Sequence, residues 1–317
     1  MAVAACGAVP RNLARPPEEQ KPQSKDGLFF GVCRHPLEPM DGPVRKRRMT
    51  EKIPRRIIQT DKSADLPLLA KAATTNLRLL NPDFEYLFFD DARVEEFIDA
   101  EFPRYRPVFD SFPVRIQRYD FFRYLAVYRL GGFYFDTDVF LASNLEDLLG
   151  YSCVFPFEEL SLHSFLHKQY GMDWEIGNYA FGAAAGHPFL EAVIKNCVQA
   201  QQHPESAEAM LKSIPRIFRS EFFVFDTTGP GLVSRTLAEY PGACDRVKVL
   251  FPEDVCDPNT WHCFGTYGVH LQGGTWREPK GFVRRRLNRL WESATRKALM
   301  KQSLKRGGKR SLEFKRP

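Results

Sequence analysis

The chain has 317 residues, 44% of them hydrophobic and 27 of them Phe, which excludes a disordered composition and allows a large buried core. Its net charge of +6 is unevenly distributed: residues 53–276 contain 20 Lys and Arg against 30 Asp and Glu, whereas residues 277–317 contain 15 against 3. An acidic body needs a cation to bind an anionic ligand, whereas basic ends can contact a membrane or nucleic acid directly.

Residues 1–52 contain many prolines and charges without a sustained hydrophobic period, which predicts a flexible basic leader. No stretch approaches the ~20 apolar residues that a membrane-spanning helix needs, and the first residues make a poor signal peptide. Seven cysteines without a CxxC pair do not indicate a disulfide scaffold, although Cys244, Cys256 and Cys263 lie close in sequence. We therefore expect a soluble or peripheral protein, or one whose targeting segment lies outside this chain.

From residue 53 onward the hydrophobic pattern predicts alternating strands and helices. Strands are expected at 53–58, within 81–91 after a turn, and at 133–139, 153–159, 178–184, 247–252 and 267–272. Helices are expected at 66–80, 92–102, 115–130, from 187, at 206–219 and after 227–231, with Gly131 ending the helix at 115–130. This alternation predicts an α/β domain over 53–276, with a mostly parallel central sheet and helices on both faces.

The segment 277–317 is expected to form a basic amphipathic helix and a tail. Its apolar stripe consists of Val283, Leu287, Leu290, Trp291, Ala294 and Ala298. A helix of this kind either lies on an anionic membrane surface or packs its stripe against the domain, and both interpretations remain open.

An acid pair stands out in the stretch "RLGGFYFDTDVF". In an extended strand, Asp136 and Asp138 would share one face with Tyr134. Two carboxylates this close repel each other, and a hard divalent cation such as Mg²⁺ or Mn²⁺ would relieve that repulsion. The alternative is an exposed strand end with two solvated aspartates.

Four more stretches accompany the string from Asp120 and Arg123 to the acid pair: "IPRRIIQT", "NYAFGAAAGHPFL", "TTGPGLVSR" and "GVHLQGGTW". Together they resemble the glycosyltransferases with a DxD-containing sugar-binding region, glycosyltransferase family 32. That family includes fungal outer-chain α-1,6-mannosyltransferases and inositol-phosphoceramide mannosyltransferases. The resemblance implies a GT-A type, Rossmann-like nucleotide-sugar-binding fold and a Golgi or secretory location, although no signal peptide or membrane anchor is visible.

The resemblance also implies roles for individual residues. Asp136 and Asp138 would hold Mn²⁺ or Mg²⁺ against the donor diphosphate, with His270 as a further metal or phosphate ligand. Asn178 would help to position the sugar. The nucleotide-sugar contacts would come from Ile58, Gln59, Thr60, Asp120, Arg123, Tyr134 and Trp276.

The function that the resemblance implies is metal-dependent, retaining transfer of a hexose to a glycan or glycolipid. GDP-mannose is the leading donor and a UDP-hexose the next, while nucleic acid is an improbable partner. The acids Glu158, Glu159, Asp173 and Glu175 are expected in segments that border the acceptor. Two rivals remain: a non-catalytic carbohydrate- or membrane-binding protein that retains the fold, and a phosphatase of the haloacid-dehalogenase type, whose strands also end in D-x-D.

Overall fold

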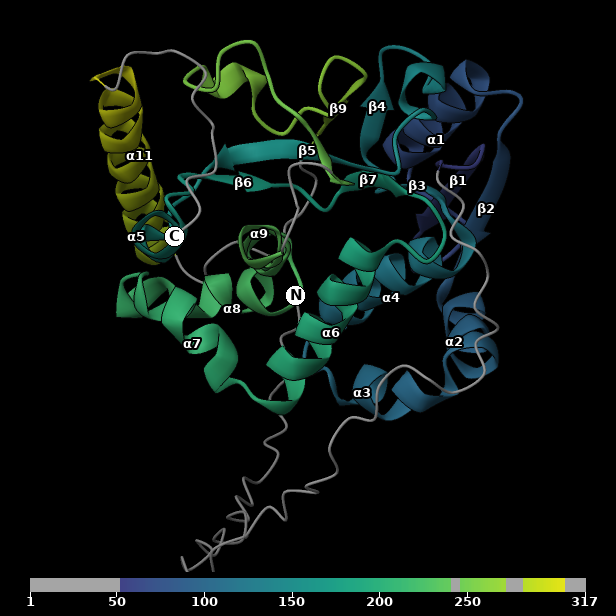
Figure 1. Cartoon of the computed structure of the whole chain (residues 1–317), viewed down its shortest axis with the longest axis horizontal. Coiled ribbons are helices and arrows are strands. Elements are labelled where there is room, and N and C mark those ends of the chain that lie inside the picture. The colour runs from purple at the N-terminus through teal and green to yellow at the C-terminus, as the bar shows by residue number, and fades with distance from the viewer. Residues whose placement is uncertain (1–51, 241–245, 272–281, 306–317) are drawn as a thin grey trace, which may run out of the picture. The chain divides into compact units, whose positions relative to one another are not determined.

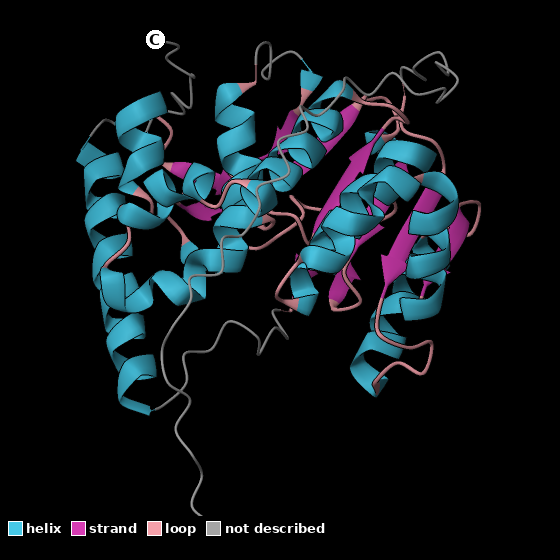
Figure 2. Cartoon of the chain, turned by 90° about the horizontal axis from the view of Figure 1, so that it is seen from below, coloured by secondary structure: helices cyan, strands magenta, loops and turns pink. Residues whose placement is uncertain are grey.

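The computed structural model describes residues 52–240, 246–271 and 282–305, shown in colour in Figure 1. The expected α/β class is confirmed: α4 and α6 lie on one side of a central sheet, and α1 lies on the other (Figures 1 and 2). The predicted flexible leader lies outside the described residues, except for Lys52.

Within the described ranges the central sheet has seven strands in the order β2-β1-β3-β7-β5-β6, with β8 paired to β5. The strands are β1 (Arg56–Thr60), β2 (Glu85–Phe89), β3 (Gly132–Phe135), β5 (Cys153–Leu160), β6 (Trp174–Ile176), β7 (Ala180–Ala183) and β8 (Lys248–Leu250). The pairs β1–β2, β1–β3 and β5–β8 are parallel, whereas β7 is antiparallel to β3 and β5, and β6 is antiparallel to β5. The sheet is therefore mixed, but most of its strands run in one direction, as the sequence indicated.

A separate two-stranded ribbon consists of β4 (Val139–Leu141) and β9 (Gly268–His270), which pair antiparallel. The prediction of one continuous strand over 133–139 is therefore wrong. The Asp136 amide still donates to the Tyr179 carbonyl beside β7 (2.7 Å), and the chain then leaves the sheet because the Asp136 carbonyl accepts from the Val139 amide (3.2 Å), which closes a turn. The strand expected at 267–272 exists as β9, but it belongs to this ribbon and not to the central sheet.

The helices follow the predicted periodicity with some differences at their ends. They are α1 (Leu68–Leu80), α2 (Asp91–Glu101), α3 (Arg106–Ser111), α4 (Arg115–Leu130), α5 (Ser164–Tyr170), α6 (Pro188–Gln202), α7 (Glu205–Lys212), α8 (Arg219–Thr227), α9 (Pro230–Glu239) and α11 (Phe282–Lys305). Short 3₁₀ turns are η1 (Pro103–Tyr105), η2 (Glu146–Leu148), η3 (Arg216–Phe218) and η4 (Pro258–Thr260). The single helix predicted at 206–219 is wrong: it breaks before Pro215, whose ring removes a helical hydrogen bond, and α8 follows as a separate helix.

Two glycines connect α4 to β3 at the centre of the domain. Gly131 ends the helix with φ +66°, and Gly132 has φ +113°. A Cβ on Gly132 would lie 2.6 Å from the Arg56 carbonyl oxygen, so this position brings β3 close against β1. The connection fixes where β3 begins, and the acid pair follows directly after this short strand.

Aromatic packing fills both sides of the sheet. Phe133 and Phe135 belong to the core cluster that also contains Val139 of the ribbon. On the sheet's other side Phe155 and Phe181 stack with ring centroids 4.9 Å apart. The core thus anchors the strand that precedes the acid pair and the ribbon that follows it.

The C-terminal helix is present as α11, but its expected stripe is not packed as one face. Of the predicted stripe, Trp291 contacts Phe218, whereas Val283 and Leu290 are 69% and 59% exposed. The alternative in which the whole stripe packs against the domain is therefore wrong. Across the coloured parts of Figure 1, no helix is both long and apolar enough to cross a bilayer.

The thiols that the structure describes are free. They are Cys153, Cys197, Cys256 and Cys263, while Cys244 of the sequence cluster lies outside the described residues.

Candidate functional site

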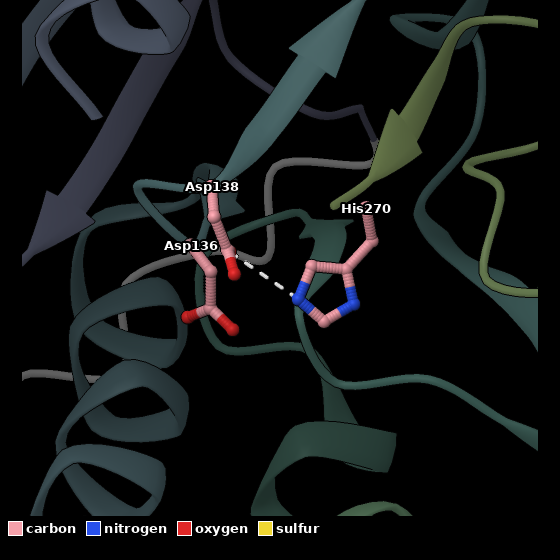
Figure 3. A group of neighbouring side chains, drawn as sticks. All are labelled: Asp136, Asp138 and His270. Atoms are coloured by element: carbon pink, nitrogen blue, oxygen red, sulfur yellow. Dashed lines mark ion pairs between the residues drawn. The ribbon is translucent and has the colours of Figure 1, made fainter. Parts of the chain in front are cut away.

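Asp136, Asp138 and His270 form a cluster in which one ligand atom from each lies within 4.8 Å of the others (Figure 3). The His270 Nε2 atom is 3.2 Å from Asp138 Oδ1. Asp136 follows β3, Asp138 precedes β4, and His270 ends β9, where it lies opposite Val139. The ribbon therefore brings the three expected metal ligands together, although a long stretch of chain separates the histidine from the acids.

The carboxylate of Asp136 is held in place by two neighbours. The Tyr134 hydroxyl donates to Asp136 Oδ1 (2.7 Å), and Arg123 Nη1 lies 3.3 Å from the same oxygen. The Arg123 guanidinium also lies over the Tyr134 ring, 4.7 Å from its centroid. Tyr134 and Asp136 thus share one side, as expected, while Asp138 reaches the cluster through the turn and not through strand alternation.

A buried polar network lies behind Asp136. Asp120 is 3.3 Å from Arg123 Nη2, accepts from Asn178 Nδ2 (3.1 Å), and accepts from the Thr228 hydroxyl (2.9 Å). Arg123 donates to the Asn178 carbonyl (2.9 Å), and Asn178 Nδ2 also donates to the Tyr124 hydroxyl (2.8 Å). The helix α4 therefore positions Asp136 through a closed set of contacts with the β6–β7 connection and the segment after α8.

The site disfavours two negative charges. Burial raises the pKa of Asp136, and the Asp138 charge raises it further, while Arg123 and His270 act in the opposite direction. Burial raises the pKa of Asp120 to about 6 despite the contacts with Arg123, Thr228 and Asn178. Burial lowers the pKa of His270, but the hydrogen bond and charge of Asp138 outweigh it and raise the pKa overall.

These residues fit a hard divalent cation. The Asp136 and Asp138 side chains are each 26% exposed and that of His270 is 17% exposed, so a ligand can reach them. Two carboxylates with one imidazole suit Mn²⁺ or Mg²⁺, and a bound cation would offset the repulsion between the acids. The His270 ring stacks on Tyr179, with centroids 4.3 Å apart, which holds Nε2 toward the acids.

The strand β1 approaches the site through Gln59. Its amide nitrogen lies 3.3 Å from the Asp136 carbonyl, and its oxygen accepts from Thr74 and Tyr86 (3.0 Å each). Ile58 and Gln59 are fully buried and Thr60 is 7% exposed. Their predicted contact with the donor base remains a prediction, and Gln59 has an observed role in fixing the end of β3.

The acids expected beside the acceptor lie in or next to strands. Glu158 Oε1 is 3.0 Å from His262 Nδ1, and Glu159 Oε2 is 2.6 Å from Arg296 of α11. Both glutamates belong to β5 and are buried. Glu175 lies in β6 and accepts a hydrogen bond from Ser161. Their proposed contact with an acceptor remains a prediction.

Two further residues that the sequence placed at the site are Trp276 and Asp173. Trp276 lies outside the described residues, and the Asp173 carbonyl, next to β6, accepts from the Ser161 amide (2.9 Å).

Some site neighbours carried no assigned role from the sequence. Tyr124, Tyr179 and Thr228 contact the network or His270, and Thr137 donates to Asp61 Oδ2 (2.9 Å) beside the acid pair. Thr228 lies in the "TTGPGLVSR" stretch, which contributes to the resemblance but had no role assigned to any of its residues. Asp61 directly follows a buried strand, a position that could have marked it as a site residue.

Comparison with known proteins identifies the region that contains the acid pair. Residues 67–155 match the family described as "Glycosyltransferase sugar-binding region containing DXD motif". The chain is 34% identical over 144 residues to inositol phosphoceramide mannosyltransferase 3 of Schizosaccharomyces pombe, which covers 45% of this chain and 37% of that protein. It is 26% identical over 231 residues to inositol phosphoceramide mannosyltransferase 2 of the same organism, covering 71% and 58%.

A solved structure, the PaToxG glycosyltransferase, is similar at a TM-score of 0.42 and 15% identity, covering 61% of this chain and 72% of that chain. The chain spans 37% to 58% of the length of the fission yeast relatives. Because the matched region contains Asp120, Arg123 and both aspartates of the cluster, motif and geometry coincide. Residues 67–155 are therefore similar to the sugar-binding region of glycosyltransferases that contains a DXD motif, and the acid pair of the cluster lies within that match.

Proposed function

We propose that the protein is a metal-dependent hexosyltransferase that moves a sugar, with mannose as the leading choice, from a nucleotide sugar to a hydroxyl of a glycolipid or glycan. GDP-mannose is the first donor to test and UDP-hexoses the second. The observation that carries this proposal is the cluster of Asp136, Asp138 and His270, which the DXD region and the β4–β9 ribbon bring together.

Asp136, Asp138 and His270 would hold the cation. When bound, Mn²⁺ or Mg²⁺ would supply Lewis-acid stabilisation of the charge that builds on the departing diphosphate. Arg123 and Tyr134 hold the Asp136 carboxylate in one orientation, so little reorganisation is needed when the donor binds.

The donor contacts remain predictions that the network supports. Asp120 and Arg123 are each 4% exposed, so any direct contact with sugar or ribose would involve only their tips. Asn178, 7% exposed, is fixed by Asp120 and Tyr124 and would orient the sugar. Retention of the anomeric configuration is part of the proposal and rests on the family resemblance.

The acceptor class is supported by the relatives, which are named as mannosyltransferases of inositol phosphoceramide. A glycolipid is met at a bilayer, so peripheral membrane contact through the basic C-terminal helix belongs to the same proposal. Neither the names of the relatives nor the proposed membrane contact identifies the location in the cell.

The test is release of nucleoside diphosphate by the purified full chain with Mn²⁺, a glycolipid acceptor and a panel of GDP-mannose and UDP-hexoses. Asp138→Asn removes a ligand charge, and we expect the turnover to fall by about 100-fold or more. Asp65→Asn is the matched control, because the Asp65 side chain is 89% exposed, and we expect its turnover to stay within about twofold.

Unchanged turnover in Asp138→Asn would refute the assignment. Mn²⁺-dependent binding of a sugar nucleotide without release, with every acceptor, would identify a non-catalytic binding protein. Hydrolysis of p-nitrophenyl phosphate without release from any sugar nucleotide would identify a phosphatase.

A further inference from the structure

The helix α11 carries an apolar face that points away from the domain. Val283, Leu287 and Leu290 are 69%, 48% and 59% exposed, and Ala294 and Ala298 are also exposed. These five residues, here called the outer stripe, recur every three or four positions and so lie along one side of the helix. Exposed apolar side chains in a contiguous row mark an interaction surface more often than isolated ones do.

Two arginines of α11 hold the helix against the domain through specific contacts. Arg284 Nη2 donates to the Ile217 carbonyl (2.6 Å) and to the Ser220 hydroxyl (2.7 Å). Further along, Arg296 Nη2 is 2.6 Å from Glu159 Oε2. Polar contacts near the start of the helix and in its second half thus hold it while the outer stripe stays exposed.

An aromatic contact between these two arginines also holds α11 against the domain. Trp291 packs on Phe218 and Phe222, with ring centroids 5.3 Å and 6.0 Å apart. Asn288 is 8% exposed on the same side of the helix. The domain therefore uses Trp291 and polar residues of α11, and not the outer stripe, for its own packing.

The apolar surface continues from α11 onto the turn η3. Val283 and Leu287 line a hollow of about 580 Å³ together with Ile217, which is 58% exposed. Arg216 and Arg284 line the same hollow. An apolar recess bordered by guanidinium groups suits a lipid, whose acyl chains are apolar and whose phosphate accepts hydrogen bonds from arginine.

Positive charge surrounds the outer stripe. Residues 282–305 contain eight Lys and Arg and a single acid, Glu292. Arg286, Lys297 and Lys301 are exposed, and each lies three or four residues from a member of the outer stripe. A partner must therefore accept apolar side chains and supply negative charge across a broad surface, and a bilayer with anionic lipids meets both requirements.

We propose that α11 docks the protein on the surface of a membrane that contains anionic lipids, with the outer stripe and Ile217 in the interfacial layer. The helix would lie in the plane of the bilayer and would not span it. The inference deepens the proposed function, since it rests on that function for the reason to be at a membrane, while its own test needs no transferase activity.

The test is sedimentation of the full chain with phosphatidylcholine vesicles that contain either no anionic lipid or about 30 mol % phosphatidylserine. We expect binding to the anionic vesicles to be at least about tenfold tighter. The double variant Leu287→Asp/Leu290→Asp should weaken it by at least about tenfold, because two apolar contacts are replaced by charges that anionic lipids repel.

Leu79→Asp is the matched control, because Leu79 is 75% exposed on α1, far along the chain from α11, and it should bind like the wild type. Arg286→Gln/Lys297→Gln/Lys301→Gln should lose the preference for phosphatidylserine while keeping the wild-type melting temperature. Equal binding to both vesicles, or wild-type binding by the Leu287→Asp/Leu290→Asp variant, would overturn the proposal.

Two further measurements separate this inference from the proposed function. The Leu287→Asp/Leu290→Asp variant should release nucleoside diphosphate from the sugar nucleotide at the wild-type rate when the acceptor is water-soluble. The Asp138→Asn variant should lose that release and still bind the anionic vesicles. Vesicle binding without any transferase activity would leave the docking surface standing and refute only the function.

Discussion

At the scale of single residues, the site depends on one arginine that serves several acceptors. Arg123 is 4% exposed and contacts Asp120, Asp136 and the carbonyl of Asn178. Buried carboxylates are stable only with partners, so the guanidinium fork allows Asp120 to lie close behind Asp136 of the cluster. Because Asp120 is also buried, the stability of its charged form depends on each of its other hydrogen bonds.

Thr228 supplies one of those hydrogen bonds, and Thr228→Val removes its hydroxyl with little change in shape. The hydroxyl lowers the pKa of Asp120, so its loss should raise that pKa further above about 6. A carboxylate whose pKa is raised in the folded state makes the protein less stable as pH rises through that range. We therefore expect a loss of about 1–3 kcal/mol of unfolding free energy near pH 8 and a smaller loss near pH 5, measured by urea denaturation.

Thr236→Val provides the control for this comparison. Thr236 is also buried, and its hydroxyl donates to the Leu232 carbonyl of its own helix. The Thr236→Val variant should lose the same unfolding free energy near pH 5 and near pH 8. An equal loss at both pH values for Thr228→Val as well would contradict a role through Asp120.

At the scale of elements, the sequence predicted the parts that depend on local pattern and missed those set by long-range pairing. The helix expected at 115–130 is observed with those bounds, because its apolar spacing and Gly131 are local signals. The break after β3 was not visible, since it depends on the turn between Asp136 and Val139 and on the pairing of Val139 with His270 in the ribbon. At the site, the acids and His270 were all expected from motifs, whereas the way His270 reaches the acids, opposite Val139, depends on the ribbon.

The glycine turn before β3 gives a prediction at this scale. Gly132→Ala would place a methyl group 2.6 Å from the Arg56 carbonyl oxygen at φ +113°, so both a clash and backbone strain result. We expect a loss of about 2–4 kcal/mol of unfolding free energy, measured by denaturation with urea. Gly150→Ala, whose Cβ would meet nothing within 4 Å, should change it by less than about 1 kcal/mol. Similar stability of the two variants would show that β3 does not depend on this close approach.

At the scale of the domain, a second buried ionic group joins the helices that lie away from the acid pair. His163 Nε2 is 3.1 Å from Asp226 Oδ1, and both side chains are fully buried. His163 Nδ1 lies 3.3 Å from the Ser213 hydroxyl. The cluster links the start of α5, the end of α7 and helix α8, so its protonation affects how these three helices pack together.

This cluster predicts how stability changes with pH. Burial lowers the pKa of His163, but the charge and hydrogen bond of Asp226 raise it more, to about 9. The stabilisation is therefore present below the ordinary pKa of 6.5 and is lost as pH rises through about 9. Burial also raises the pKa of Glu175 to about 7. Its ionisation therefore also lowers the stability as pH rises, but at a lower pH than that of His163. We expect the unfolding free energy to fall by on the order of 2–3 kcal/mol between neutral pH and about pH 9.

The variant Asp226→Asn should be less stable near pH 6 and should lose most of this slope above neutral pH, as followed by urea denaturation. Glu205→Gln serves as the control, because the pair of His203 and Glu205 is exposed, at 55% and 69%. That variant should keep the wild-type slope. A slope that survives in Asp226→Asn would assign the pH dependence to other groups.

The ribbon of β4 and β9 also sets the time at which the cluster can exist in a growing chain. Asp136 and Asp138 are synthesised long before His270, and β4 has no β9 strand to pair with until Gly268–His270 has been made. At ~5–20 residues per second, the acids wait roughly 7–27 s for the histidine during synthesis. A nascent chain therefore carries the acid pair without its third ligand, and full metal affinity should appear only when the chain has folded past β9. The proposed metal binding would then distinguish a finished domain from a truncated one.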